Sequence, residues 1–124
     1  MKLRIRGDSI RLRLTQSEVA TLVDSGRIEE STAFGPSPLE RFSYAIVLGG
    51  EVVAAKSTAK GIEIVLPAAT GRAWASSASV GIEAEQPAGD GRTLRILVEK
   101  DFACLTQRPH EDDSDAFPNP NTSC

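Results

Sequence analysis

The sequence predicts an α+β domain that consists mostly of antiparallel β-strands, with about eight short strands and two helices. Three observations lead to this fold class. Short stretches alternate charged or polar residues with apolar ones, which is typical of half-buried strands. Two segments carry helix signals, and turn residues, mostly Gly and Pro, separate the strand-like stretches.

The first predicted element is a β-hairpin in MKLRIRGDSIRLRL. Charged and apolar residues alternate on both sides of Gly7 and Asp8, which are placed as the two central residues of a type II′ turn. This register sets Arg4 opposite Arg11 and apolar residues opposite apolar ones. Like charges directly across a strand pair destabilise it by roughly some tenths of a kcal/mol. We therefore expect an anionic group on that face.

The next stretch, LTQSEVATLVDSG, predicts a helix over about residues 16–25. Thr15 and Glu18 form a Thr-x-x-Glu capping box, and Leu14 and Val19 have the spacing of a hydrophobic staple. Gly26 stands where a C-terminal cap is expected. The helix is thus delimited at both ends by local signals.

The remaining predicted elements are six strands and one short helix. Strands are predicted at about 28–34, 40–48, 51–57 and 62–66, and a short helix is predicted to begin at Pro67 and to carry Trp74. Two further strands follow at about 79–85 and 92–100, with PAGDG as the loop between them. The order is therefore ββαββ followed by ββαββ.

The two halves of the sequence keep one offset. Adding 52 to the residue number takes Leu12 to Ile64 and Ile28 to Val80. Either a structural duplication or the regular spacing of a small β-rich domain would produce this pattern. We expect the strands to close into a barrel or to bend into a strongly curved sheet, with the helices against one face.

Length and composition indicate one domain. The chain has 124 residues, of which 40% are hydrophobic and 25% charged, and no apolar run approaches the ~18 residues needed to cross a bilayer. We expect an α+β domain over residues 1–105 and an acidic, Pro-containing tail over 106–124 that packs back on it. The alternating charges at the N-terminus differ from the apolar run of a signal peptide, so a cytoplasmic location is expected.

Opposite charges gather at the two ends of the sequence. Residues 1–13 carry five cations and one anion, a net charge of +4, whereas residues 109–124 carry four acids and no Lys or Arg, a net charge of −4. The five cations, called the basic face below, are Lys2, Arg4, Arg6, Arg11 and Arg13. The acids of the tail are Glu111, Asp112, Asp113 and Asp115. We expect these acids to be counter-ions of the basic face.

The basic face has two further interpretations. Its cations could each pair with an acid on a neighbouring strand, such as Glu63, Glu83, Glu85 or Glu99. They could also form an anion site, because the forked donors of Arg suit carboxylate and phosphate groups.

The tail also has alternatives. Its acids could bind Mg²⁺ or Ca²⁺, and Cys104, His110 and Cys124 could contribute to a Zn²⁺ site. The spacing matches neither an EF-hand loop nor a compact zinc site, so no metal or other cofactor is expected. A free acidic tail is the remaining alternative.

The sequence favours a binding or interaction module over an enzyme. The one histidine lies in a Pro-flanked acidic segment, and no phosphate loop, Gly-x-Gly-x-x-Gly or Cys-x-x-Cys motif is present. We expect the basic face to take an acidic segment or a small anion. Nucleic acid is disfavoured, because the net charge is −3 and aromatic residues make up only 5% of the chain.

The alternative function is a metal-dependent enzyme that acts on phosphate esters or polyphosphate. The arginines would clamp the substrate, and Glu63, Glu83 or Glu99 would bind the metal.

At MKLRIRGDSIRLRLTQSEV and EKDFACLTQRPHEDDSDAFPNP the chain resembles a family of small uncharacterised bacterial proteins, a domain of unknown function. The resemblance runs along the whole chain and implies a bacterial cytoplasmic protein, without an activity or a ligand. Glu111-Asp112, Asp115 and Pro118-Asn119-Pro120 belong to the pattern of this family, whereas His110 and Cys124 do not. The architecture also resembles the triphosphate tunnel enzymes, whose barrel binds polyphosphate and a divalent metal, but their opening Glu-x-Glu-x-Lys signature is missing here.

Overall fold

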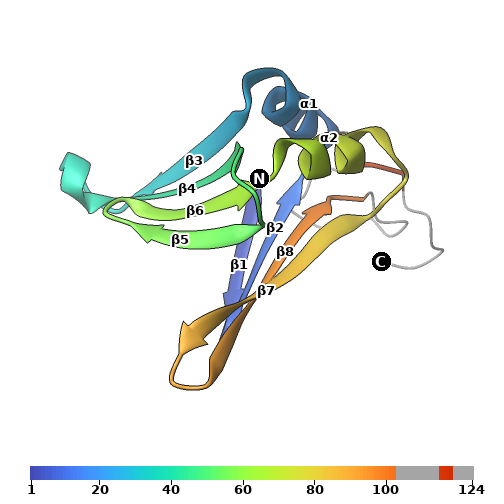
Figure 1. The fold of residues 1–124 in the computed structure, drawn as a ribbon. Coiled ribbons are helices and arrows are strands. Elements are labelled where there is room, and N and C mark those ends of the chain that lie inside the picture. The colour runs from blue at the N-terminus through green and yellow to red at the C-terminus, as the bar shows by residue number, and fades with distance from the viewer. Residues whose placement is uncertain (103–114, 119–124) are drawn as a thin grey trace.

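Residues 1–102 and 115–118 are the part of the chain that this computed structural model describes. Within that part the chain forms eight β-strands and two α-helices (Figure 1). The helices are α1 (Gln16–Ser25) and α2 (Ala68–Ser76), and a short 3₁₀ helix, η1, spans Pro38–Glu40. The strands are β1 (Lys2–Arg6), β2 (Ser9–Leu14), β3 (Arg27–Ala33), β4 (Arg41–Leu48), β5 (Ala54–Thr58), β6 (Gly61–Leu66), β7 (Gly81–Gly89) and β8 (Arg92–Lys100).

The strands form two four-stranded sheets, with the orders β1-β2-β8-β7 and β3-β4-β6-β5. Neighbours are antiparallel except at the centre of each sheet, where β2 runs parallel to β8 and β4 parallel to β6. The helices lie at the end where the two sheets converge, and the strand hairpins point away from them (Figure 1). The predicted α+β class with mostly antiparallel strands is confirmed. The expected barrel or single curved sheet is wrong, because no ladder joins the two sheets within the described residues.

The N-terminal hairpin has the register predicted from its sequence. β1 and β2 pair antiparallel, with Arg4 opposite Arg11 and Lys2 opposite Arg13. Gly7 has a φ of 53°, a positive value that glycine adopts without steric cost and that the first residue of a type II′ turn needs.

The helix predicted over residues 16–25 is α1, and its caps are those expected. The Thr15 backbone N–H donates to the Glu18 carboxylate at 2.9 Å, and the Glu18 N–H donates to the Thr15 hydroxyl. Gly26 ends the helix with a φ of 76°, and its N–H donates to the Leu22 carbonyl at 2.8 Å. Val19 and Leu22 are buried, so the apolar side of the helix faces the sheets.

The core lies between the inner faces of the two sheets and beneath the helices. Trp74 of α2 is buried with Leu22 of α1, and the indole N–H donates to the Val80 carbonyl at 3.2 Å. Burying each large apolar side chain contributes about 1.5–3 kcal/mol. The fully buried large side chains are Leu12, Leu14, Leu22, Ile46, Ile64, Leu66, Ile96 and Val98.

The two halves of the chain repeat the same structure. β2 spans residues 9–14 and β6 spans 61–66, a difference of 52, and β1 and β5 differ by the same number. The strand pairing shows the same offset. Leu12 pairs with Val98, and Ile64 pairs with Ile46, so the corresponding residues of the two pairs differ by 52. Each sheet therefore combines one hairpin from the first half of the chain with one hairpin from the second half.

One predicted equivalence is wrong. Ile28 is opposite Ile46, and the residue opposite Val98 is Ile82, so Ile28 corresponds to Ile82 instead of Val80. The physical reason is a longer connection, because α2 and β7 are separated by residues 77–80 whereas Gly26 alone separates α1 from β3.

Side chains join the two sheets where ladders do not. The Gln86 side-chain amide of β7 donates to the Ala55 carbonyl and accepts from the Ala55 N–H of β5, both at 2.9 Å. These bonds form the junction between β5 and β7. At the other junction, between β1 and β3, the Met1 amino group before β1 lies 2.6 Å from a carboxylate oxygen of Glu30 in β3. The Tyr44 hydroxyl also donates to Glu30, at 3.1 Å.

The last hairpin is longer than predicted. β7 continues to Gly89, so most of the PAGDG stretch belongs to a strand. The turn consists of Asp90 and Gly91, whose φ values of 52° and 71° are both positive, as a type I′ turn requires. None of the helices in residues 1–102 and 115–118 is long and apolar enough to cross a membrane.

We expect Gly61→Ala to lower the free energy of unfolding by about 2–4 kcal/mol. Gly61 has a φ of 153°, and a Cβ there would lie 1.9 Å from the Ser43 carbonyl oxygen. The control is Ser9→Ala at the equivalent position of the first half, which should change stability by less than about 0.5 kcal/mol. Urea unfolding of the two variants measures both values, and equal effects would contradict the close approach at Gly61.

Candidate functional site

The cations of the basic face share the outer surface of the sheet β1-β2-β8-β7. Side chains alternate between the two faces of a strand, and Leu3 and Leu12 point into the core. The residues between them, Lys2 and Arg4 on β1 and Arg11 on β2, therefore point outward. Arg6 and Arg13 follow the same alternation.

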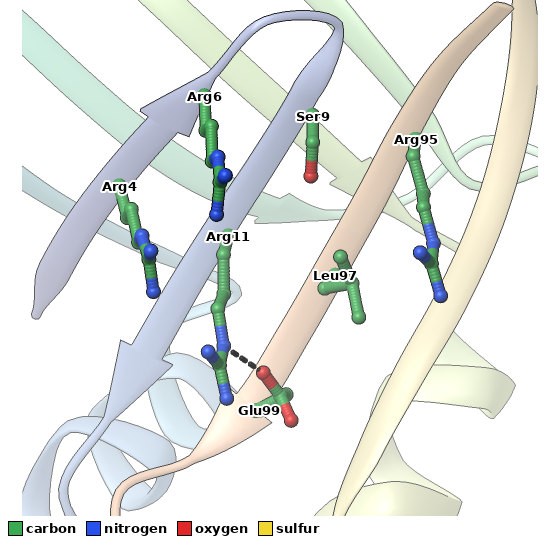
Figure 2. Close-up of a pocket in the computed structure, with 7 residues that line it drawn as sticks. All are labelled: Arg4, Arg6, Ser9, Arg11, Arg95, Leu97 and Glu99. Carbon is green, nitrogen blue, oxygen red and sulfur yellow. Dashed lines mark hydrogen bonds and ion pairs between the residues drawn. The ribbon is translucent and has the colours of Figure 1, made fainter.

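Part of the basic face lines a shallow depression of about 360 Å³ (Figure 2). In Figure 2 the side chains of Arg4, Arg6, Arg11 and Arg95 extend to the same side, from three strands. Arg95 was not predicted, although it occupies an alternating position in RTLRILVEK, because nothing local places β8 beside β2. The lining residues are Arg4, Arg6, Ser9, Arg11, Arg95, Leu97 and Glu99.

Acids of the same sheet neutralise some of these cations. Arg11 donates from Nε to the Glu99 carboxylate. Arg95 donates to Glu83 at 2.9 Å from Nε and 2.5 Å from Nη2, and these bonds raise the pKa of Arg95 above its ordinary value. Lys2 forms an ion pair with the buried Asp101, with Nζ and Oδ2 3.1 Å apart.

Three arginines of the basic face have no such partner among the described residues. Arg4, Arg6 and Arg13 form no ion pair with any residue in the described ranges 1–102 and 115–118. The interpretation in which every cation pairs with a neighbouring acid therefore accounts for only part of the face. Excess positive charge remains on adjacent strands of this part of the structure.

The outer surface of the second sheet shows that the fold does not require a basic face. On that surface Arg27 donates to Glu63 at 3.1 Å and to Glu29 at 3.2 Å. The residues 52 positions after the five cations of the basic face lie on β5 and β6. They are one cation, one acid and three uncharged residues. In the order of Lys2, Arg4, Arg6, Arg11 and Arg13, these equivalents are Ala54, Lys56, Thr58, Glu63 and Val65.

The structure does not bring all three acids of the alternative metal-dependent enzyme together. Glu83 and Glu99 are bonded to arginines on the first sheet, whereas Glu63 lies on the second. No group of three His, Cys, Asp or Glu side chains suited to a metal ion occurs among the described residues. Cys104, His110 and Cys124 lie outside those residues.

The described piece of the C-terminal tail packs against α1. The Gln16 N–H donates to the Asp115 carbonyl at 3.0 Å, and the Ser17 N–H donates to the Asp115 carboxylate at 3.2 Å. The Ser17 hydroxyl donates to the same carboxylate, and this bond helps to hold the pKa of Asp115 below its ordinary value. Ala116 is buried. The partner of Asp115 is therefore the first turn of a helix, whose exposed N–H groups favour an anion.

Of the predicted tail acids, only Asp115 lies in the described part of the chain. Glu111, Asp112 and Asp113 lie outside it. Their role as counter-ions of the basic face stays a prediction.

Phe117 continues this contact over the end of β8. Its N–H donates to the Asp101 carbonyl at 2.7 Å, and its ring meets that of Phe102 edge-on, with centroids 5.8 Å apart. Lys100, only 5% exposed, lies under the rings of Phe117 and Trp74 and donates to a backbone carbonyl. Burial lowers the pKa of its ammonium group. The tail segment thus packs next to the Lys2–Asp101 pair, at one end of the basic face.

Comparison with known proteins identifies a family but not a function. The model of a family of unknown function, DUF7009, matches residues 1–121. The chain belongs to this family. This agrees with the resemblance expected from its two ends. No curated protein and no solved structure matched the chain.

We expect Asp115→Asn to lower thermal stability at neutral pH. A carboxyl whose folded pKa is lowered stabilises the protein above its ordinary pKa, and the contribution is lost as the pH falls through the lowered value. The melting temperatures of variant and wild type should therefore converge as the pH falls from about 5 to about 2. In the control Asp24→Asn, a charge is removed near the C-terminal end of α1, which should not destabilise. A difference independent of pH would contradict the role of the Asp115 charge.

Proposed function

We propose that this protein is a binding module whose basic face takes an acidic polypeptide segment. The observation that carries the proposal is the set of Arg4, Arg6 and Arg13, which form no ion pair within the described residues and lie on two neighbouring strands. The proposal keeps the bacterial, cytoplasmic setting expected from the sequence.

The energetic argument rests on the register of β1 and β2. Arg4 lies directly opposite Arg11, and adjacent strands are only about 4.8 Å apart, so the two guanidinium groups repel each other. Glu99 compensates Arg11 but leaves Arg4 without an acid in this part of the structure. A carboxylate from a ligand would remove this repulsion and gain charge-assisted hydrogen bonds.

The spacing of the arginines supports a polypeptide over a compact phosphate. Arg4 and Arg6 are two positions apart on one strand, which separates their Cα atoms by about 6.7 Å. Carboxylates on alternate residues of an extended chain have the same spacing. A phosphate-handling enzyme would also need a metal site beside the arginines. Glu83 and Glu99 are each bonded to an arginine, Glu63 lies on the second sheet, and no group of three metal-ligating side chains occurs among the described residues.

The proposal predicts that Arg4→Gln with Arg6→Gln weakens binding of a short Glu-rich peptide about tenfold at low salt. The loss should shrink at high salt, because screening already weakens the wild-type interaction. The matched control is Lys56→Gln with Lys60→Gln, which removes two cations at the second sheet. Calorimetric titration measures the affinities. Equal losses in both variants, or none in either, would contradict the basic face as the site.

A second measurement separates the peptide from the phosphate ligand. Thermal unfolding is followed with the Glu-rich peptide and, separately, with tripolyphosphate and Mg²⁺. We expect stabilisation by the peptide and no added effect of Mg²⁺. Neutralising Glu111, Asp112 and Asp113 by Gln and Asn should strengthen peptide binding if these acids compete for the basic face. Stabilisation that requires Mg²⁺ with tripolyphosphate would favour the enzyme instead.

A further inference from the structure

Strand β1 is an edge of its sheet, and part of its backbone points away from β2. With a two-residue turn, Arg6 and Ser9 form a hydrogen-bonded pair, and the pairs then alternate along the hairpin. The N–H and C=O groups of Leu3 and Ile5 consequently point outward. Neither residue makes an outward backbone hydrogen bond within the described residues.

The second half of the chain confirms this direction and shows how an equivalent edge is closed. Ala55 of β5 occupies the position of Leu3, and both of its backbone groups bond to the Gln86 side chain at 2.9 Å. Thr32 is the equivalent of Gln86 in the first half. Gln86 pairs with Leu94, Thr32 pairs with Phe42, and Phe42 and Leu94 are related by the offset of 52. No hydrogen bond joins Thr32 to β1 in the described part of the chain.

The two sides of this open edge differ in character. Ile5 lies on the inner side of β1 and is 56% exposed, although it is a large apolar residue. Arg4 and Arg6 lie on the outer side and form no ion pair within the described ranges. The edge thus combines outward backbone groups, an exposed apolar side chain and two cations.

We propose that an acidic segment of a partner protein binds by adding a strand to the β1 edge. This inference rests on the proposed function and specifies how the ligand lies. The backbone of the segment would bond to Leu3 and Ile5, as Gln86 bonds to Ala55 at the other junction. Its sequence would alternate Asp or Glu, directed at Arg4 and Arg6, with apolar residues that cover Ile5.

The chemistry of the edge supports this ligand over a purely apolar strand. Natural edge strands carry charged side chains that prevent pairing with unsuitable strands, and the arginines would have this effect on any strand that lacks acids. Backbone bonds would supply affinity and the alternating acids would supply specificity. A free anion could contact the arginines. It would leave the backbone groups of Leu3 and Ile5 without hydrogen-bond partners and the Ile5 side chain exposed.

The test uses the full chain and a short peptide in which Glu alternates with Val. Ile5→Pro removes the outward N–H while leaving the ladder to β2 intact, because proline is tolerated where an edge N–H faces solvent. Ile5→Ala is the matched control, since it also removes the Ile side chain but keeps the N–H. We expect Ile5→Pro to bind the peptide about tenfold more weakly than Ile5→Ala. Thermal unfolding establishes that both variants are folded.

A second arm changes the peptide instead of the protein. Methylation of the peptide nitrogens on one edge should abolish the binding to wild type, whereas methylation of those on the other edge should not. If the Arg4→Gln, Arg6→Gln variant loses affinity but neither proline nor methylation matters, strand addition is overturned and the proposed function survives. If the arginine variant binds normally, the proposed function itself fails. If that variant only self-associates, the arginines merely protect the edge, and both proposals are overturned.

Discussion

The parallel pairing of β2 with β8, and of β4 with β6, is the constraint on which the structure depends. These four strands carry the buried centre of the molecule, including Leu12, Ile64, Ile46 and Val98. Neither half of the chain can complete a sheet alone, because each sheet takes one hairpin from each half. Both sheets therefore combine strands of the two ββαββ units, and the basic face acquires Arg95 and Glu99 only after distant segments have met.

Elements with local rules could be predicted from the sequence, and pairings between distant segments could not. The register of β1 with β2 follows from strict alternation around Gly7, and the limits of α1 follow from its capping box and Gly26. The parallel pairs have no local signal, so the sequence predicts a barrel or one strongly curved sheet instead of two separate sheets. The connection after α2 is longer than that after α1, which shifted the predicted equivalent of Ile28 by two residues.

The same distinction holds for the candidate site. The cations on β1 and β2 could be placed on one surface because they belong to one hairpin. The roles of Arg95 and of Asp101, the buried partner of Lys2, depend on β8 lying beside β2 and had no signal in the sequence. Asp115 illustrates a competing interaction, because the N-terminal turn of α1 offers N–H and hydroxyl donors to its carboxylate.

The internal repeat has a consequence for valency. Two identical ββαββ units arranged as these halves are would present two equivalent outer surfaces and could crosslink two partners. In this chain Glu63 and Val65 occupy the places of Arg11 and Arg13. Gln86 bonds to β5, whereas Thr32 makes no hydrogen bond to β1 within the described residues. For a ligand that needs both the arginines and the open edge, the described part of one chain would therefore offer a single site, and crosslinking two partners would require two chains.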